Sequence, residues 1–305
     1  MKHIFILSFI VISISALCQN NYKDYYYNRY KAENQIFNNN FDSALYFYEQ
    51  AFNTVDYVLV RELYNVSVIA ASKQDSSLFV CTMCKAISQG LELNTGIAKK
   101  SKYIRNYNNK LGFILNSKYD SCRLVYINTF DFELKKEILL MDELDNKSYS
   151  KKNNYKEITR IDSINQIRLK LIIEQKGGVP GEVIIGYCGK GYYFGNPSDI
   201  IIHHSFNDGI SDSLLRESVY AGKYSPFQFA MRYDYHNTNY ALEITDEDRL
   251  KTKAYYIFSV KALKSVNKEI INAVNLWRKD VLLPTVEHSF MRQEFNNRKY
   301  KFIFD

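Results

Sequence analysis

Beyond its first eighteen residues, the chain lacks an apolar run long enough to cross a membrane. A membrane-spanning helix needs about 20 consecutive apolar residues, and no later segment approaches that length. The opening run, residues 4–17, is nearly unbroken but too short to cross a hydrocarbon core of about 30 Å comfortably. We therefore predict no transmembrane helix after residue 18.

Blocks of a single charge sign are also absent. The chain has 40 Lys and Arg against 33 Asp and Glu, a net charge of +7. The two signs are interspersed along segments such as residues 151–162 and 245–253. Because nucleic-acid binding calls for clustered basic side chains, the pattern predicts an ordinary solvated surface and no nucleic-acid partner.

Cysteine is scarce, and its spacing does not form a full metal or redox signature. Four of the five cysteines follow residue 18: Cys81, Cys84, Cys122 and Cys188. Cys81 and Cys84 form a C-x-x-C pair inside a helical pattern, with no second pair and no histidine at ligand spacing. Two positions three apart share a helix face, which favours packing. A disulfide, redox chemistry and metal binding remain alternatives.

The signatures of zinc proteases, serine hydrolases, phosphate-binding loops and kinases are missing. A glycine-rich stretch at residues 186–195 fails the dinucleotide-binding pattern, because Phe194 stands where the third glycine belongs and Gly195 comes one residue late. We predict an ordinary loop there and no cofactor. Whether the protein is an enzyme, and whether it binds a metal, the sequence leaves open.

The N-terminus has the three parts of a secretory signal peptide. A lysine precedes the apolar run, and Ala16 and Cys18 occupy the small-x-small positions before a cut that would leave Gln19 first. We predict a signal peptide over residues 1–18 and an exported protein, periplasmic or secreted. The alternative is a lipoprotein signal with Cys18 acylated, although Leu17 stands where such signals have a small residue.

Residues 22–95 resemble a degenerate pair of tetratricopeptide units. Ala44, Tyr48 and Ala51 follow the small, large, small spacing of that repeat's second helix, which lets two helices interlock closely. Ala86 follows Ala51 by 35 residues, close to the repeat's period of about 34. Phe79 replaces the small residue of the second copy. Such units bind a protein or peptide on a concave face, or simply cap and support a neighbouring part.

The central part has a less regular pattern. Residues 96–154 are predicted as a helical connector, with short helices over 94–118, a helix over 119–144 and a loop over 146–154. A further long helix is expected from residue 155 to residue 176. We place the last domain at residues 155–305.

Within that domain, residues 161–237 contain an ordered series of features. A helix stopped by Gly177, Gly178 and Pro180 leads to an apolar stretch ending at His204, then to a helix closed by Gly222 and a helix opened by Pro226. This order resembles DUF6624, a family of bacterial proteins defined only as a domain of unknown function. The matching positions are Asp162, Asn165, Gly178, Pro180, Gly186, His204, Asp208, Gly222, Pro226, Ala230 and Asp234, with Asn275 and Arg278 further on.

The resemblance implies a helical domain and no particular activity. Many members of the family continue with a Gln-x-Tyr-Gly element, but here Tyr235 and His236 follow Asp234 and that element is absent. Any chemistry shared with the family is therefore in question.

The candidate site residues are His204, Asp208 and Asp234. His204 and Asp208, four apart, share a helix face, which suits a metal site or a carboxylate-oriented general base. His203 points about 100° away from its neighbour on a helix. The alternative is structural: His204 and Asp208 fix a helix end, and Asp234 accepts from a neighbouring backbone group or Arg232.

We predict a mainly α protein, with a few short strands near Val183–Ile185 or Lys301–Phe304. The leading hypothesis for its function is a non-catalytic binding or scaffolding module of the bacterial cell envelope. The alternative is a hydrolase-like enzyme that uses His204, Asp208 and Asp234. A secreted effector or immunity-type protein acting through a partner surface is a third possibility.

Overall fold

The computed structural model describes residues 20–93, 102–150, 155–189, 196–204, 210–237, 250–255, 266–295 and 302–304. The predicted signal peptide, residues 1–18, lies outside these ranges. Every regular element within them is an α-helix, which confirms the mainly α fold class. The helices are α1 (Tyr22–Phe37), α2 (Phe41–Phe52), α3 (Val60–Lys73), α4 (Ser76–Ile87), α6 (Lys102–Thr129), α7 (Phe132–Ser150), α8 (Tyr155–Lys176), α9 (Glu182–Ile185), α10 (Ser198–His204), α11 (Asp212–Tyr220), α12 (Pro226–Asn237), α15 (Lys268–Asp280) and α16 (Val286–Phe295).

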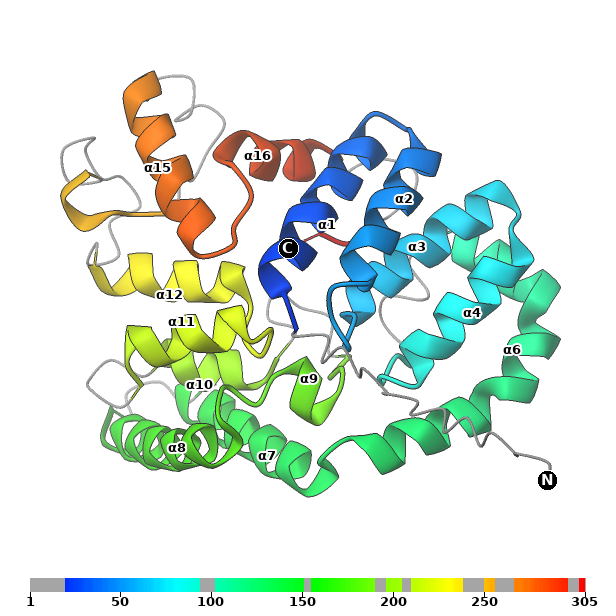
Figure 1. Cartoon of the computed structure of the whole chain (residues 1–305). Helices are drawn as coiled ribbons and strands as arrows, with labels where there is room; N and C mark the ends of the chain where they lie inside the picture. Colours follow the sequence, from blue (N-terminus) through cyan, green and yellow to red (C-terminus); the bar gives the residue numbers. More distant parts are fainter. Residues whose placement is uncertain are drawn as a thin grey trace, which may run out of the picture.

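The first four helices form two packed pairs, α1 with α2 and α3 with α4 (Figure 1). Side-chain caps set the starts of α1 and α4: Asn21 accepts from Asp24 N, and Asp75 accepts from Leu78 N at 3.0 Å. Ala44, Tyr48 and Ala51 are all buried, as their small, large, small spacing predicts. The tetratricopeptide character of these helices stays a prediction.

The departure of the second copy from the repeat pattern has a packing reason. Phe79, on α4, is fully buried, and its ring meets Tyr107 of α6 edge-on with centroids 4.9 Å apart. The large side chain of Phe79 therefore packs against the next helix, α6, where a small residue would allow close packing of two helices. Figure 1 shows α6 leaving the four-helix region and leading to α7 along one edge of the molecule.

The central part differs from the sequence prediction. Residues 102–129 form one long helix, α6, instead of short helices, and the break before α7 falls at residues 130–131, inside the helix predicted over 119–144. Asp131 fixes that break by accepting from Leu134 N at 3.0 Å. Residues 146–150, predicted as a loop, continue α7, because Asn146 donates to Asp142 O and Ser148 donates to Asp145 O within the helix.

The prediction of short strands is wrong for the residues that the structure describes. Val183–Ile185 lie in the one-turn helix α9, which ends where Gly186 adopts a left-handed φ of 70°. Residues 302–304 pair with no strand. Instead, the main-chain groups of Ile303 bond to the side chain of Asn65 in α3.

The two ends of the described chain are joined by a buried ionic network. Glu33 of α1 bonds Arg29 at 3.0 Å, Arg292 at 2.7 Å and His288 at 2.7 Å, and Arg29 also pairs with Glu62 of α3 at 2.7 Å. All five side chains are buried. One apolar cluster extends from α1 to residue 304, across the domain limits predicted at residues 95 and 154, and that division remains untested.

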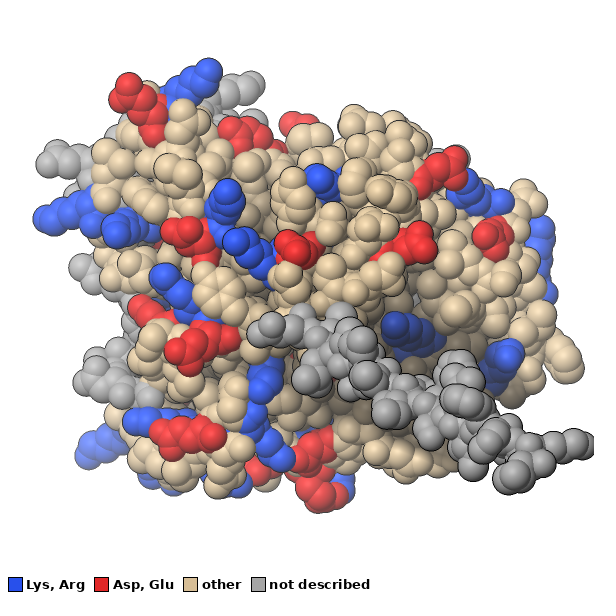
Figure 2. All heavy atoms as spheres, in the orientation of Figure 1, with Lys and Arg blue, Asp and Glu red and all other residues tan. Residues whose placement is uncertain are grey.

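None of the described helices combines the length and the apolarity that a bilayer-crossing helix needs. On the face shown in Figure 2, basic and acidic side chains are interspersed.

Candidate functional site

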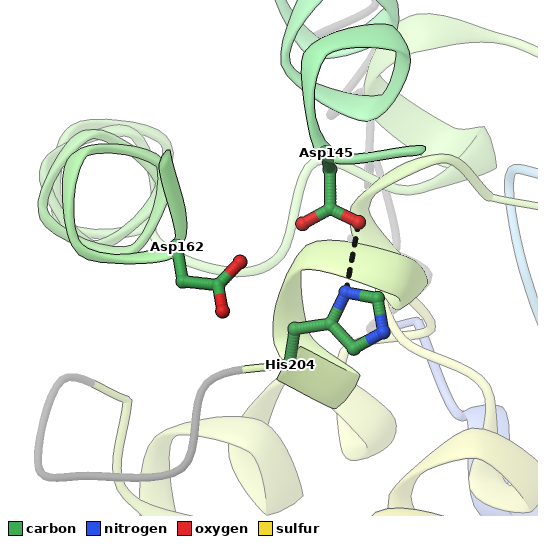
Figure 3. A group of neighbouring side chains, drawn as sticks. All are labelled: Asp145, Asp162 and His204. Carbon is green, nitrogen blue, oxygen red and sulfur yellow. Dashed lines mark hydrogen bonds and ion pairs between the residues drawn. The ribbon is translucent and has the colours of Figure 1, made fainter. Parts of the chain in front are cut away.

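Three helices bring two carboxyl groups and one imidazole together. Asp145 lies near the end of α7, Asp162 in the first half of α8 and His204 at the last position of α10. One ligand atom from each lies within 4.8 Å of the others, and Figure 3 shows the three side chains converging on the same space. Among the described residues, this is the one group of three or more such side chains arranged to hold a metal ion.

Hydrogen bonds fix two of the three side chains relative to each other. His204 Nδ1 and Asp145 Oδ2 are 2.8 Å apart (Figure 3). The Asp145 side chain is 1% exposed and the His204 side chain 20% exposed. The His204 ring stacks on Tyr149, with centroids 4.1 Å apart. The Tyr149 hydroxyl also donates to Asp162 Oδ2 at 3.0 Å, so this tyrosine contacts two members of the centre, His204 and Asp162.

Each aspartate keeps one buried oxygen that accepts no hydrogen bond from the described residues. These atoms are Asp145 Oδ1 and Asp162 Oδ1. A buried carboxylate oxygen without a donor costs free energy, and such atoms are uncommon in proteins unless water or an ion satisfies them. Burial raises the pKa of Asp162, and the nearby Asp145 carboxyl raises it further, against the opposing effects of Tyr149 and His204.

A divalent cation suits this donor set. Two carboxylates and a neutral imidazole supply two oxygens, one nitrogen and two negative charges, and no described Lys or Arg forms an ion pair with either aspartate. Mixed oxygen and nitrogen donors favour zinc or manganese over calcium and magnesium, which prefer oxygen alone. Donors sharing one zinc ion lie about 3.4 Å apart. The donors that now lie up to 4.8 Å apart would close by up to about 1.4 Å around an ion, whereas His204 Nδ1 and Asp145 Oδ2, now 2.8 Å apart, would separate slightly.

The apolar stripe of α7 explains how Asp145 reaches this position. Leu134, Ile138 and Met141 are buried on one face of the helix, and Asp145 continues that face at the next four-residue step. An acid on an apolar stripe is the one signal in the sequence that points to Asp145. Asp145 is absent from the predicted site because this end of the helix was expected to border a loop.

On α8, the residue one turn after Asp162 joins this helix to α7. Asn165 is buried and donates to Met141 O of α7 at 3.2 Å, which joins the two helices beside the centre. Gln166 donates to His204 O at 3.3 Å and so holds the end of α10 against α8. These two bonds tie α8 to α7 and to the end of α10 beside the centre.

The structure places one of the three predicted site residues, His204, in this centre. Asp208 falls outside the described residues. Asp234 is buried on α12, where its Oδ1 accepts from Tyr255 N at 2.8 Å. The rings of His203 and Tyr235 lie 4.6 Å apart, so the two adjacent histidines have different neighbours.

The four described cysteines are free thiols. Cys84 of α4 lies close to Cys122 of α6 as well as to Cys81. Burial and a hydrogen bond with the Cys122 thiol raise the pKa of Cys84 to about 11. Because the thiolate is the reactive form, a raised pKa argues against redox or metal chemistry at the C-x-x-C pair.

The comparison with known proteins adds no relative. No family model, no curated protein and no solved structure matches this chain. The resemblance to DUF6624 therefore stays a prediction. Two positions of that pattern, Asp162 and His204, nevertheless meet in the centre, and a third, Asn165, ties the helices that form it.

Proposed function

We propose that this is an exported binding protein whose functional centre, Asp145, Asp162 and His204, holds one divalent transition-metal ion. The observation on which the proposal depends is the pair of buried carboxylate oxygens, Asp145 Oδ1 and Asp162 Oδ1, that accept no hydrogen bond from the described residues. One ion would satisfy both oxygens and cancel both charges. Export is proposed from the signal-like residues 1–18 alone.

Metal content tests this proposal. Residues 19–305 are dialysed separately against Zn²⁺, Mn²⁺ and Ca²⁺, and the bound metal is measured by elemental analysis. We expect about one Zn²⁺ or Mn²⁺ per chain and much less Ca²⁺. Asp145→Asn and His204→Ala should lose the ion. Glu143→Gln should keep it, because Glu143 is an exposed acid of the same helix paired with Lys147.

Two results would contradict the proposal: a parent chain without bound metal, or equal metal in the parent and both site variants. Circular dichroism shows whether each variant is folded. Asp145 is fully enclosed and His204 is partly exposed, so His204→Ala provides the second measurement if Asp145→Asn unfolds.

A hydrolase-like enzyme using His204 is the second candidate. The buried Asp145 carboxyl orients the imidazole through Nδ1 and leaves Nε2 to take a proton, as in a general base. Asp208 and Asp234 are the other residues of this hypothesis. Among the described residues, the small cavity lined by Asp199, His203 and Tyr224 has room for about one water molecule.

Turnover distinguishes the two candidates. The metal-loaded parent chain is tested on ester, phosphodiester and peptide substrates beside His204→Ala. Turnover that His204→Ala abolishes while it remains folded would favour the enzyme. Bound metal without turnover on any of the three would favour a binding protein.

A further inference from the structure

The last described segment, residues 302–304, is held by a side-chain amide. Asn65 Nδ2 donates to Ile303 O at 2.8 Å, and Asn65 Oδ1 accepts from Ile303 N at 2.9 Å. The amide thus pairs with both main-chain groups of one residue. Asn65 Nδ2 also lies 3.4 Å from the Tyr48 hydroxyl, which helps to fix the orientation of the amide.

Alternate side chains of the segment are buried beside this amide. Phe302 and Phe304 are buried and Ile303 is partly buried, which is the two-residue period of an extended chain. The ring of Phe302 lies 6.1 Å from that of Phe41, and the ring of Phe304 lies 5.4 Å from that of Phe37. Both also contact Phe295, at 6.0 and 6.1 Å.

Asn65 is an unusual residue for its place in the fold. It is 1% exposed, within the mostly apolar helix α3, between the buried neighbours Tyr64 and Val66. A buried amide is costly unless its donors and acceptor are matched. The groups that match it here are a peptide main chain and one hydroxyl, and main-chain groups are the same in every sequence. The amide therefore matches the main-chain groups of an extended segment, and aromatic rings contact the side chains of that segment.

We propose that Phe37, Phe41, Asn65 and Phe295 form a peptide-binding surface that the chain's own C-terminal segment fills. Its partner is a polypeptide with an extended aromatic-x-aromatic segment, which competes with residues 302–304. The chemistry of the partner is taken from the segment seated there: two main-chain bonds to Asn65 and two rings at alternate positions. The proposal is independent of the metal centre.

A labelled peptide of residues 299–305, KYKFIFD, is the probe. Its binding is measured by fluorescence polarisation to the parent, to full-length Phe302→Ala/Phe304→Ala, and to a chain ending at residue 300. Because a filled surface lowers apparent affinity by the fraction of molecules in which it is open, both altered chains should bind at least about tenfold more tightly than the parent. Adding Asn65→Ala to either should remove that binding, and a peptide with both phenylalanines replaced by alanine should not bind.

Three results would overturn the proposal. The first is that neither altered chain binds the peptide although circular dichroism shows it folded. The second is that the parent binds as tightly as the altered chains. The third is that both altered chains unfold, since residues 302–304 would then be a fixed part of the core and not an exchangeable occupant.

Discussion

At the residue scale, the most informative side chains are acids placed where an acid is costly. Asp145 and Asp162 hold orphaned oxygens, and Glu182 of α9 is another acid in an enclosed place. Glu182 Oε1 accepts from Val60 N at 2.6 Å and from the Tyr57 hydroxyl at 3.1 Å. Even with these donors, burial raises the pKa of Glu182 from its usual 4.5 to about 7.

The raised pKa makes stability depend on pH in a defined direction. Below about pH 4.5 both the folded and the unfolded chain hold the proton of Glu182. Between about 4.5 and 7 the folded chain keeps it and the unfolded chain has lost it, so the free energy of unfolding falls as pH rises. Urea denaturation of the parent and Glu182→Gln from pH 4.5 to 8 measures this. The parent should lose stability relative to the variant across that range; parallel curves would contradict the assignment.

Tyr149 gives a second expectation at this scale. Its hydroxyl donates to Asp162 and its ring stacks on His204, so Tyr149→Phe keeps the stacking and removes the hydrogen bond. Loss of a hydrogen bond to a metal ligand weakens affinity by about tenfold or more. Equilibrium dialysis with Zn²⁺ should show that weakening without loss of the one-to-one stoichiometry. An unchanged affinity would show that the hydrogen bond from Tyr149 does not support metal binding.

At the element scale, the sequence predicted helices best where caps and apolar spacing agree. Ala44, Tyr48 and Ala51 fall on the buried face as expected, and Gly222 follows the end of α11 as expected. The wrong predictions concern short segments. The four residues of α9 read equally well as a strand. The break at residue 131 depends on one aspartate cap, which the hydrophobic pattern does not contain.

Gly222, which follows the end of α11, should not tolerate a larger side chain. Its φ is 70°, and a Cβ there would lie 2.1 Å from the ring of Tyr22. Gly222→Ala should therefore lower the free energy of unfolding by about 3 kcal/mol, from backbone strain and overpacking together. Gly112→Ala is the matched control, because a Cβ at Gly112 meets nothing within 4 Å; in a helix it should be neutral or stabilising by up to about 1 kcal/mol. Thermal and urea denaturation compare the two, and equal effects would contradict this packing.

At the scale of the whole molecule, long-range contacts hold parts of the chain together that the sequence treats separately. Glu33 of α1 meets His288 and Arg292 of α16, and no pattern in the sequence pairs residues so far apart. The same limit applies to the candidate centre. His204 was identified from its helix, but Asp145 is brought to it by the packing of α7, α8 and α10. The apolar stripe that leads to Asp145 indicates a buried acid but not which helices pack beside it.

Breaking the buried network should destabilise the whole fold. Arg29 and Arg292 hold the pKa of Glu33 well below its usual value despite burial, so Glu33 is charged in the folded chain. Removing it in Glu33→Ala leaves buried positive charge uncompensated, at a cost of about 4 kcal/mol. Glu133→Ala, which removes an exposed acid paired with Lys136, should change little. Urea denaturation measures both, and a small effect at Glu33 would show that the network does not tie α1 to α16.

The central claim is that Asp145, Asp162 and His204 form one centre, and calorimetric titration of metal-free residues 19–305 with Zn²⁺ tests it most directly. The account predicts about one ion per chain for the parent and for Glu143→Gln. Asp145→Asn, Asp162→Asn and His204→Ala, each still folded, should weaken binding by at least about a hundredfold, since they remove direct ligands. Binding that survives all three substitutions, or no binding by the parent, would contradict it.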